Sequence, residues 1–183
     1  MRLHDLLRET IDIRSAGFRS WFAGSKVVDA RGLPLKCFHG THMNHEIKPG
    51  GDQHFGTFAA ANERIHDIYE LIKTKSHDTY PPGHVSAPAI YPVYLSIKRP
   101  LTLHDCEWVD SDVITDMHIQ GLIDDDTLEC YMNGENDTDW KGLAVRLGFD
   151  GVRYHNEHED KGSLSWYPFA DHQVWNIFAD VPY

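Results

Sequence analysis

The stretch YPVYLSIKRPLTL (91–103) constrains the fold more than any other part of the sequence. Val93, Leu95 and Ile97 alternate with more polar residues, so all three fall on one face of an extended chain. Pro100 lacks the N–H that a central strand needs, and it is expected to end the regular pattern. The stretch therefore predicts a β-strand near the middle of the chain, with one face buried.

Other elements are short and alternate in type along the chain. Apolar spacing predicts one or two short helices within residues 1–22, a helix starting at Phe58, and helices over 111–119, 124–132 and 140–147. Short strands are expected at 26–28, 35–38, 152–154, 164–169 and 173–181. Strands scattered between helices indicate the α+β class. Because there is no repeat or linker, we expect one domain over 1–183, with 1–20 as an N-terminal helical extension.

Charge and cysteine content exclude several classes of function. The formal net charge is -11, so binding of a nucleic-acid backbone through a basic face is not expected. Cys37, Cys106 and Cys130 form no spaced framework, which is typical of a reduced intracellular protein. The N-terminal sequence has no long apolar stretch, so neither a signal peptide nor a membrane span is expected. A cytoplasmic location follows from these expectations.

Residues 37–45, CFHGTHMNH, place three histidines at three-residue spacing. A zinc site needs ligands that converge tetrahedrally, and Gly40 disfavours the helix that would present these side chains together. His39 differs from the other two because it follows an apolar run and precedes Gly40 and Thr41. We therefore expect no metal, a ligand-binding role for His39, and exposed loop positions for His42 and His45.

Several blocks resemble the ADP-ribosyltransferase-like domains of bacteriophage and polyvalent mobile-element proteins. The blocks are SWFAGSKVVDARGLPLKCFHGT, HFGTFAAANER, YPVYLSIKRPL, GFDGVRY and SWYPFADHQV, in this order between about residues 20 and 178. The LAVRLG stretch is similar to a phage anti-CRISPR ADP-ribosyltransferase. The resemblance implies an NAD-binding, split β-sheet core with flanking short helices, of the diphtheria-toxin and poly-ADP-ribose-polymerase type.

The resemblance also implies roles for particular residues. His39 matches the histidine of the family's His-Tyr-Glu hallmark, while Ser165 falls where the catalytic glutamate is expected. The loop before that strand offers Glu157 as first choice and Asp160 as second choice for the missing acid, with Glu159 between them. His54 could equally be a turn residue, and Phe58, or less favourably Phe55, would cover the nicotinamide ring. The expected NAD-binding set is His39, Gly40, Thr41, His54, Phe55, Gly56, Thr57, Phe58 and Ser165.

These features predict an NAD-dependent mono-ADP-ribosyltransferase that modifies a host protein as a phage or mobile-element effector. Two alternatives remain open: a non-catalytic binding module that keeps the fold, and an NAD glycohydrolase that transfers ADP-ribose to water. A serine hydrolase is not favoured, since neither Ser163 nor Ser165 lies in a Gly-x-Ser-x-Gly sequence.

Overall fold

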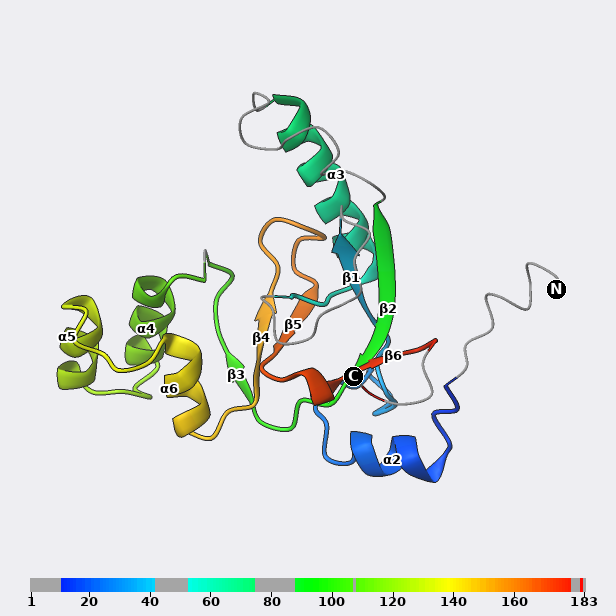
Figure 1. Ribbon diagram of the computed structural model, residues 1–183, viewed down its shortest axis with the longest axis horizontal. Helices are drawn as coiled ribbons and strands as arrows, with labels where there is room; N and C mark the ends of the chain where they lie inside the picture. Colours follow the sequence, from blue (N-terminus) through cyan, green and yellow to red (C-terminus); the bar gives the residue numbers. More distant parts are fainter. Residues whose placement is uncertain (1–10, 42–52, 75–87, 107, 179–181, 183) are drawn as a thin grey trace.

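The computed structural model describes residues 11–41, 53–74, 88–106, 108–178 and 182. Within these ranges five α-helices accompany two three-stranded sheets, which confirms the expected α+β class (Figure 1). The helices are α2 (Ala16–Phe22), α3 (Phe58–Thr74), α4 (Asp110–Ile119), α5 (Asp125–Met132) and α6 (Trp140–Arg146). The strands are β1 (Cys37–Thr41), β2 (Ala89–Leu95), β3 (Pro100–Thr102), β4 (Gly151–His155), β5 (Leu164–Pro168) and β6 (Val174–Asn176).

The two sheets differ in strand direction. The first sheet has the order β1-β2-β6, and both of its pairs are antiparallel. The second has the order β3-β4-β5, in which β3 and β4 are parallel and β4 and β5 are antiparallel. The chain therefore passes from the first sheet to the second between β2 and β3, and it returns to the first sheet between β5 and β6.

A two-residue segment, Phe55–Gly56, connects the sheets. The backbones of Gly56 and Phe38 in β1 exchange two hydrogen bonds of 2.9 and 3.0 Å. The backbones of Phe55 and Trp166 in β5 exchange two more, both of 2.8 Å. Backbone groups buried at this junction are thereby paired. Among the described residues, this segment alone forms β-bridges to both sheets.

The strand expected within 91–103, with Pro100 ending it, is shorter in the structure, and Pro100 begins a second strand in the other sheet. β2 ends at Leu95 and β3 begins at Pro100. The backbone N–H groups of Lys98 and Arg99 between them both donate to the Asp150 carboxylate, at 2.8 and 2.7 Å. Satisfying these donors with a distant side chain lets the chain bend without leaving backbone groups unpaired.

Helix α2 is packed against the first sheet. Its Phe18 is 1% exposed and contacts Tyr94 and Trp175, with ring centroids 5.2 and 5.5 Å apart. Ser15 caps the helix by accepting from the Phe18 backbone N–H at 3.1 Å. The part of the expected N-terminal extension that is described, residues 11–20, thus contributes to the core, while residues 1–10 lie outside the described residues.

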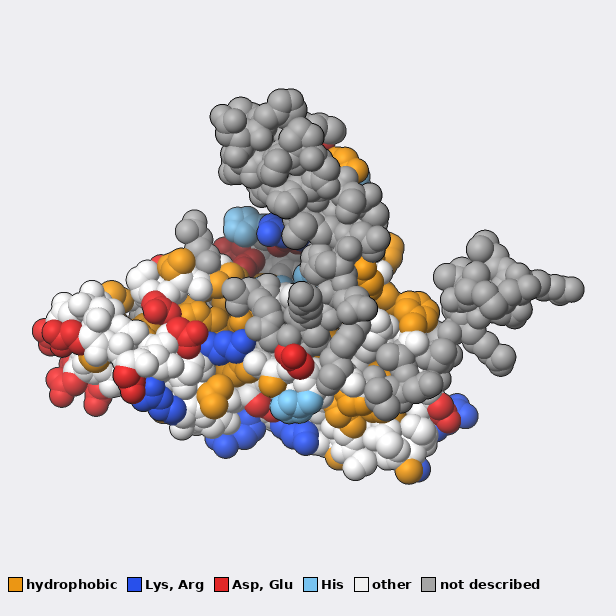
Figure 2. Space-filling model, in the orientation of Figure 1, with side chains coloured by type: hydrophobic (Ala, Val, Ile, Leu, Met, Phe, Trp, Pro, Cys, Tyr) orange, Lys and Arg blue, Asp and Glu red, His pale blue; other side chains and the backbone are white. Residues whose placement is uncertain are grey.

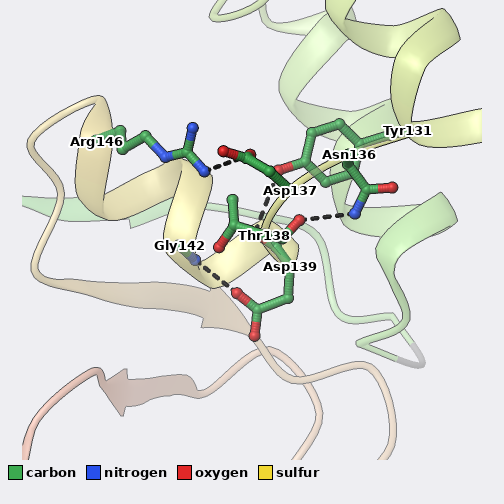
Figure 3. A network of polar contacts seen from close by, with 7 residues as sticks. All are labelled: Tyr131, Asn136, Asp137, Thr138, Asp139, Gly142 and Arg146. Atoms are coloured by element: carbon green, nitrogen blue, oxygen red, sulfur yellow. Dashed lines mark hydrogen bonds and ion pairs between the residues drawn. The ribbon is translucent and has the colours of Figure 1, made fainter. Parts of the chain in front are cut away.

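Helices α4, α5 and α6 form a helical lobe beside β3 (Figure 1). Aspartate side chains cap the N-termini of α5 and α6. Asp124 accepts from the Thr127 backbone N–H, and Asp139 accepts from the Gly142 backbone N–H at 2.8 Å. Figure 3 shows the second cap together with the ion pair between Arg146 and Asp137, whose nitrogen and oxygen are 2.6 Å apart. The lobe buries its inner face through residues such as Met117.

Candidate functional site

A cavity of about 470 Å³ lies where the two sheets meet under α3. Its lining comes from β1, the segment 53–56, the first turns of α3, β4, β5, the loop that joins those last two strands, and the residues Asp105, Cys106 and Trp108. This volume is in the range of small-molecule sites. Figure 2 shows acidic, basic and histidine side chains gathered at the hollow beside α3. The cavity is the candidate functional site because most of the predicted ligand-binding residues lie along it.

The first wall of the cavity, which we call the β1 wall, consists of His39, Gly40 and Thr41. His39 Nδ1 is 2.9 Å from the His54 carbonyl oxygen. A carbonyl only accepts, so Nδ1 carries the proton and the orientation of the ring is fixed. Thr41 is 6% exposed. The three residues that the sequence singled out are thus held on a paired strand.

Gly40 is needed for the packing of α3 on this wall. A Cβ at residue 40 would lie 2.1 Å from the Ala61 carbonyl oxygen in α3, and backbone cannot yield to it easily. The alanine-rich start of α3 has the same explanation, since Ala60 and Ala61 are 6% and 5% exposed. Small residues on both elements bring the helix close to the strand.

His54 lines the cavity within a cluster of aromatic rings. Its Nδ1 is 2.8 Å from the Tyr154 hydroxyl, and its ring stacks on Tyr167 with centroids 5.0 Å apart. Burial raises the pKa of Tyr154, so this phenol stays protonated at neutral pH. Trp108 packs edge-on against His54 and has a φ of 61°, an unusual backbone conformation for a bulky residue. The cluster gives this part of the cavity a rigid aromatic surface.

Gly56 and Ser165 meet at the floor of the cavity. Ser165 is 3% exposed and lies opposite Tyr154 in the β4–β5 register. A Cβ on residue 56 would be 2.4 Å from the Ser165 hydroxyl oxygen. The small side chain at 165 therefore has a packing reason as well as a place in the cavity lining. A larger residue there would displace the segment that joins the sheets.

Three predicted ligand-binding residues lie outside the cavity lining. Phe55 is 0% exposed, since its ring is part of the core that joins the sheets. Phe58 begins α3 and is 57% exposed, with its ring against the edge of Phe38. Thr57 donates to Asp160 instead of facing the cavity. Phe38, Trp108 and Tyr154 are the aromatic residues that line the cavity in their place.

The opposite wall, which we call the loop wall, consists of Asn156, His158 and Glu159. Glu157, the first choice for the acid, does not line the cavity: its backbone N–H donates to Asp105 at 2.9 Å, and its side chain is exposed. Asp160 does not line it either. Glu159 and Asp105 are the carboxylates on the cavity surface.

Asp160 instead attaches the loop to α3. Its carboxylate accepts from the Thr57 hydroxyl at 2.5 Å, and its backbone N–H donates to Glu63 at 2.5 Å. Its φ is 44°, a left-handed conformation that aspartate tolerates better than most residues. The residue before this turn, Glu159, lines the cavity, whereas Asp160 itself does not.

Several residues that line the cavity were not predicted from the sequence as site residues, among them Arg64, Asp105, Trp108 and Tyr154. Arg64 could have been found, because it lies three and four residues beyond Ala61 and Ala60 and so on the same helix face. Asp105 and Trp108 carried no such signal, since they lie in a stretch whose only clear feature was its acidity.

Two expected absences concern metal and membrane. Within the described ranges, no group of three or more His, Cys, Asp or Glu side chains could hold a metal ion. His42 and His45 lie outside those ranges. No helix in the described part of the chain is long and apolar enough to cross a membrane.

Comparisons with known proteins do not place the chain in a family. No protein-family model, curated protein or solved structure matches it. Functional conclusions therefore depend on the residues and on the geometry of the cavity.

Proposed function

We propose that the protein is an NAD-dependent mono-ADP-ribosyltransferase that modifies a host macromolecule. The observation that carries this proposal is the cavity where two three-stranded sheets meet, which is lined both by the His-Gly-Thr sequence of β1 and by the carboxylates of Glu159 and Asp105. Such an arrangement is compatible with the split-sheet core that the sequence blocks resemble. Their likeness to phage and mobile-element domains supports a role as an effector.

The chemistry of the reaction matches the side chains available. The bond between C1′ of the ribose and the nicotinamide nitrogen breaks, and its electron pair leaves with nicotinamide. The sugar becomes oxocarbenium-like, so a carboxylate beside it stabilises the transition state. The acceptor nucleophile then bonds to C1′ and gives its proton to a base.

Individual residues can be given roles in this scheme. Glu159 is the carboxylate that would stabilise the sugar, with Asp105 as the other acid on the same surface. His39, oriented by the His54 carbonyl, would bind a ribose hydroxyl. The side-chain oxygen of Gln53 on the cavity wall is buried and has no hydrogen-bond partner among the described residues. An N–H donor on the ligand, such as the nicotinamide carboxamide, would satisfy it.

The test is incubation of the protein with labelled NAD and a bacterial lysate. Labelled protein together with released nicotinamide is the expected result. Nicotinamide release without a labelled acceptor would indicate an NAD glycohydrolase instead. Neither label nor nicotinamide would contradict the proposal.

Variants connect the activity to the cavity. His39→Ala should lower NAD affinity or turnover strongly, because this ring is on the β1 wall. His66→Ala, in the exposed part of α3, is the matched control and should change little. Equal effects of the two substitutions would place the activity elsewhere.

One observation favours a second candidate, a non-catalytic binding module. Ser165 occupies the position where the resemblance expects the glutamate, and Glu159 is engaged in an ion pair with Arg64. If calorimetry detects tight binding of a partner protein but no NAD binding and no turnover, this candidate replaces the transferase.

A further inference from the structure

The charges on the cavity surface are unevenly distributed. Arg64 carries the only guanidinium or ammonium group among the described residues that line the cavity. It lies in the second turn of α3, whose start is fixed against β1 by Ala61. Glu159 and Asp105 supply negative charge to the same surface. An anionic ligand in this cavity would therefore be attracted to one side chain.

Arg64 forms a weak ion pair with Glu159. Its Nη1 is 3.6 Å from Glu159 Oε1, longer than a charge-assisted hydrogen bond. The Arg64 side chain is 59% exposed and that of Glu159 is 22% exposed. Because the Arg64 side chain is more than half exposed, water screens its charge, and an ion pair of this kind contributes little to stability. Separating the two groups should thus cost little.

A diphosphate would be a better partner for the same guanidinium. Arginine presents a planar set of five N–H donors that can bind two phosphate oxygens at once. The 3.6 Å contact with Glu159 does not use that geometry. The helix fixes the base of Arg64, and its exposed end can turn toward a ligand.

We infer that the cavity binds a diphosphate-bearing ligand through Arg64, and that the diphosphate displaces Glu159 from this arginine. The inference rests on the proposed function, in which the ligand is NAD. Its consequence is a form of regulation by substrate. Without a diphosphate, Glu159 is paired with Arg64. Binding of the diphosphate releases Glu159, which can then act on the sugar. A nucleoside without phosphates would not release it.

Calorimetry with ADP and with adenosine tests the contact. Arg64→Gln should weaken ADP binding by about ten- to a hundredfold, the scale of a charged hydrogen-bond pair. Adenosine binding should change less than about twofold, because adenosine has no phosphate for Arg64 to hold. The matched control is Arg146→Gln, which removes a similarly exposed arginine (53%) from its ion pair in the helical lobe. ADP affinity that falls equally in both variants, or in neither, would overturn the inference.

A double-mutant cycle tests the displacement. Glu159→Gln should strengthen ADP binding about three- to tenfold, because the competitor of the diphosphate is gone. Part of any gain comes from removing a repulsive charge, and that part persists in the Arg64→Gln background. The inference requires a larger gain when Arg64 is present. Equal gains in the two backgrounds would show that Glu159 does not compete for this arginine.

The outcomes separate this inference from the proposed function. Arg64-dependent ADP binding without nicotinamide release from NAD would support the inference and contradict the transferase. Transferase activity with Arg64→Gln indistinguishable from Arg146→Gln would do the reverse. A wild-type protein that binds neither ADP nor NAD would overturn both.

Discussion

The two walls of the cavity are held in different ways. Backbone pairing between β1 and β2, together with the close contact of Gly40 with Ala61, holds the β1 wall. Hydrogen bonds within the loop and to the start of α3 hold the loop wall: Asn156 pairs with Ser163, and Thr57, just before α3, donates to Asp160. His39 thus lies on a strand, whereas Glu159 lies on a loop. Substitutions can move the acid without moving the histidine.

The largest effect is expected where the β1 wall meets α3. Gly40→Ala would place a Cβ 2.1 Å from a backbone oxygen, so the helix must move away from the strand. We expect a loss of about 3 kcal/mol in the free energy of unfolding, the upper end for overpacking. Urea denaturation measures it. Gly17→Ala in α2 is the control, because a Cβ there meets nothing within 4 Å. A loss below about 1 kcal/mol for Gly40→Ala would mean that the strand adapts readily.

The next effect concerns two glutamates of the loop, one on the loop wall and one outside it. Glu159→Gln should cut turnover about a hundredfold, the usual scale for one electrostatic partner of a transition state. Glu157→Gln should change turnover by less than about threefold, since that side chain lies outside the cavity lining. Nicotinamide release from NAD gives both rates. If Glu157→Gln lowered turnover more than Glu159→Gln, then Glu157 would be the carboxylate that stabilises the transition state.

A third effect concerns Cys37 at the start of β1, the strand that carries the β1 wall, and it depends on pH. Burial raises the pKa of the Cys37 thiol to about 12 from an ordinary value of 9.0. Above pH 9 the unfolded chain releases this proton while the folded protein keeps it, so stability falls as pH rises toward 12. One such group contributes a slope of about 1.4 kcal/mol per pH unit.

Denaturation at pH 8 to 10.5 should show this slope in the wild type and a smaller slope in Cys37→Ala. The control is Val93→Ala, which removes the register partner of Cys37 in β2. That variant should be less stable at every pH but keep the wild-type slope. An unchanged slope in Cys37→Ala would mean that folding does not raise the pKa of this thiol.

The smallest effect concerns the attachment of the loop wall to α3. Thr57 bonds both the Asp160 carboxylate and the Ala60 backbone N–H, so Thr57→Val removes a loop contact and a helix cap. We expect a loss of about 1 kcal/mol. Hydrogen exchange should quicken at 156–163 and hardly change on β1. Thr115→Val, whose hydroxyl bonds within α4, is the control. Equal quickening on both walls would remove the distinction between them.

Local patterns were enough to predict most elements of the fold and the β1 wall. His39, Gly40 and Thr41 are adjacent in sequence and on one strand, so a motif of three letters locates all of them. The five described helices were likewise expected from apolar spacing, and α2 lies within residues 1–22, as expected. These features depend on neighbours that are close along the chain.

Features that depend on distant partners could not be predicted. The bend between β2 and β3 needs Asp150, which is about fifty positions away from the two N–H groups it accepts. The position of Asp160 needs Thr57, just before α3, and Glu63, within α3, both about a hundred positions away. A sequence pattern locates acids in this loop, but it cannot tell which one the turn at Asp160 directs inward.

The Phe55–Gly56 junction has a consequence for the synthesis of the protein. Its two sides pair with Phe38 and with Trp166, so the cavity has no floor until β5 has been made. A nascent chain still lacking β5 therefore carries the histidine motif without a site to place it in. The cavity can therefore form only after β5 has been synthesised.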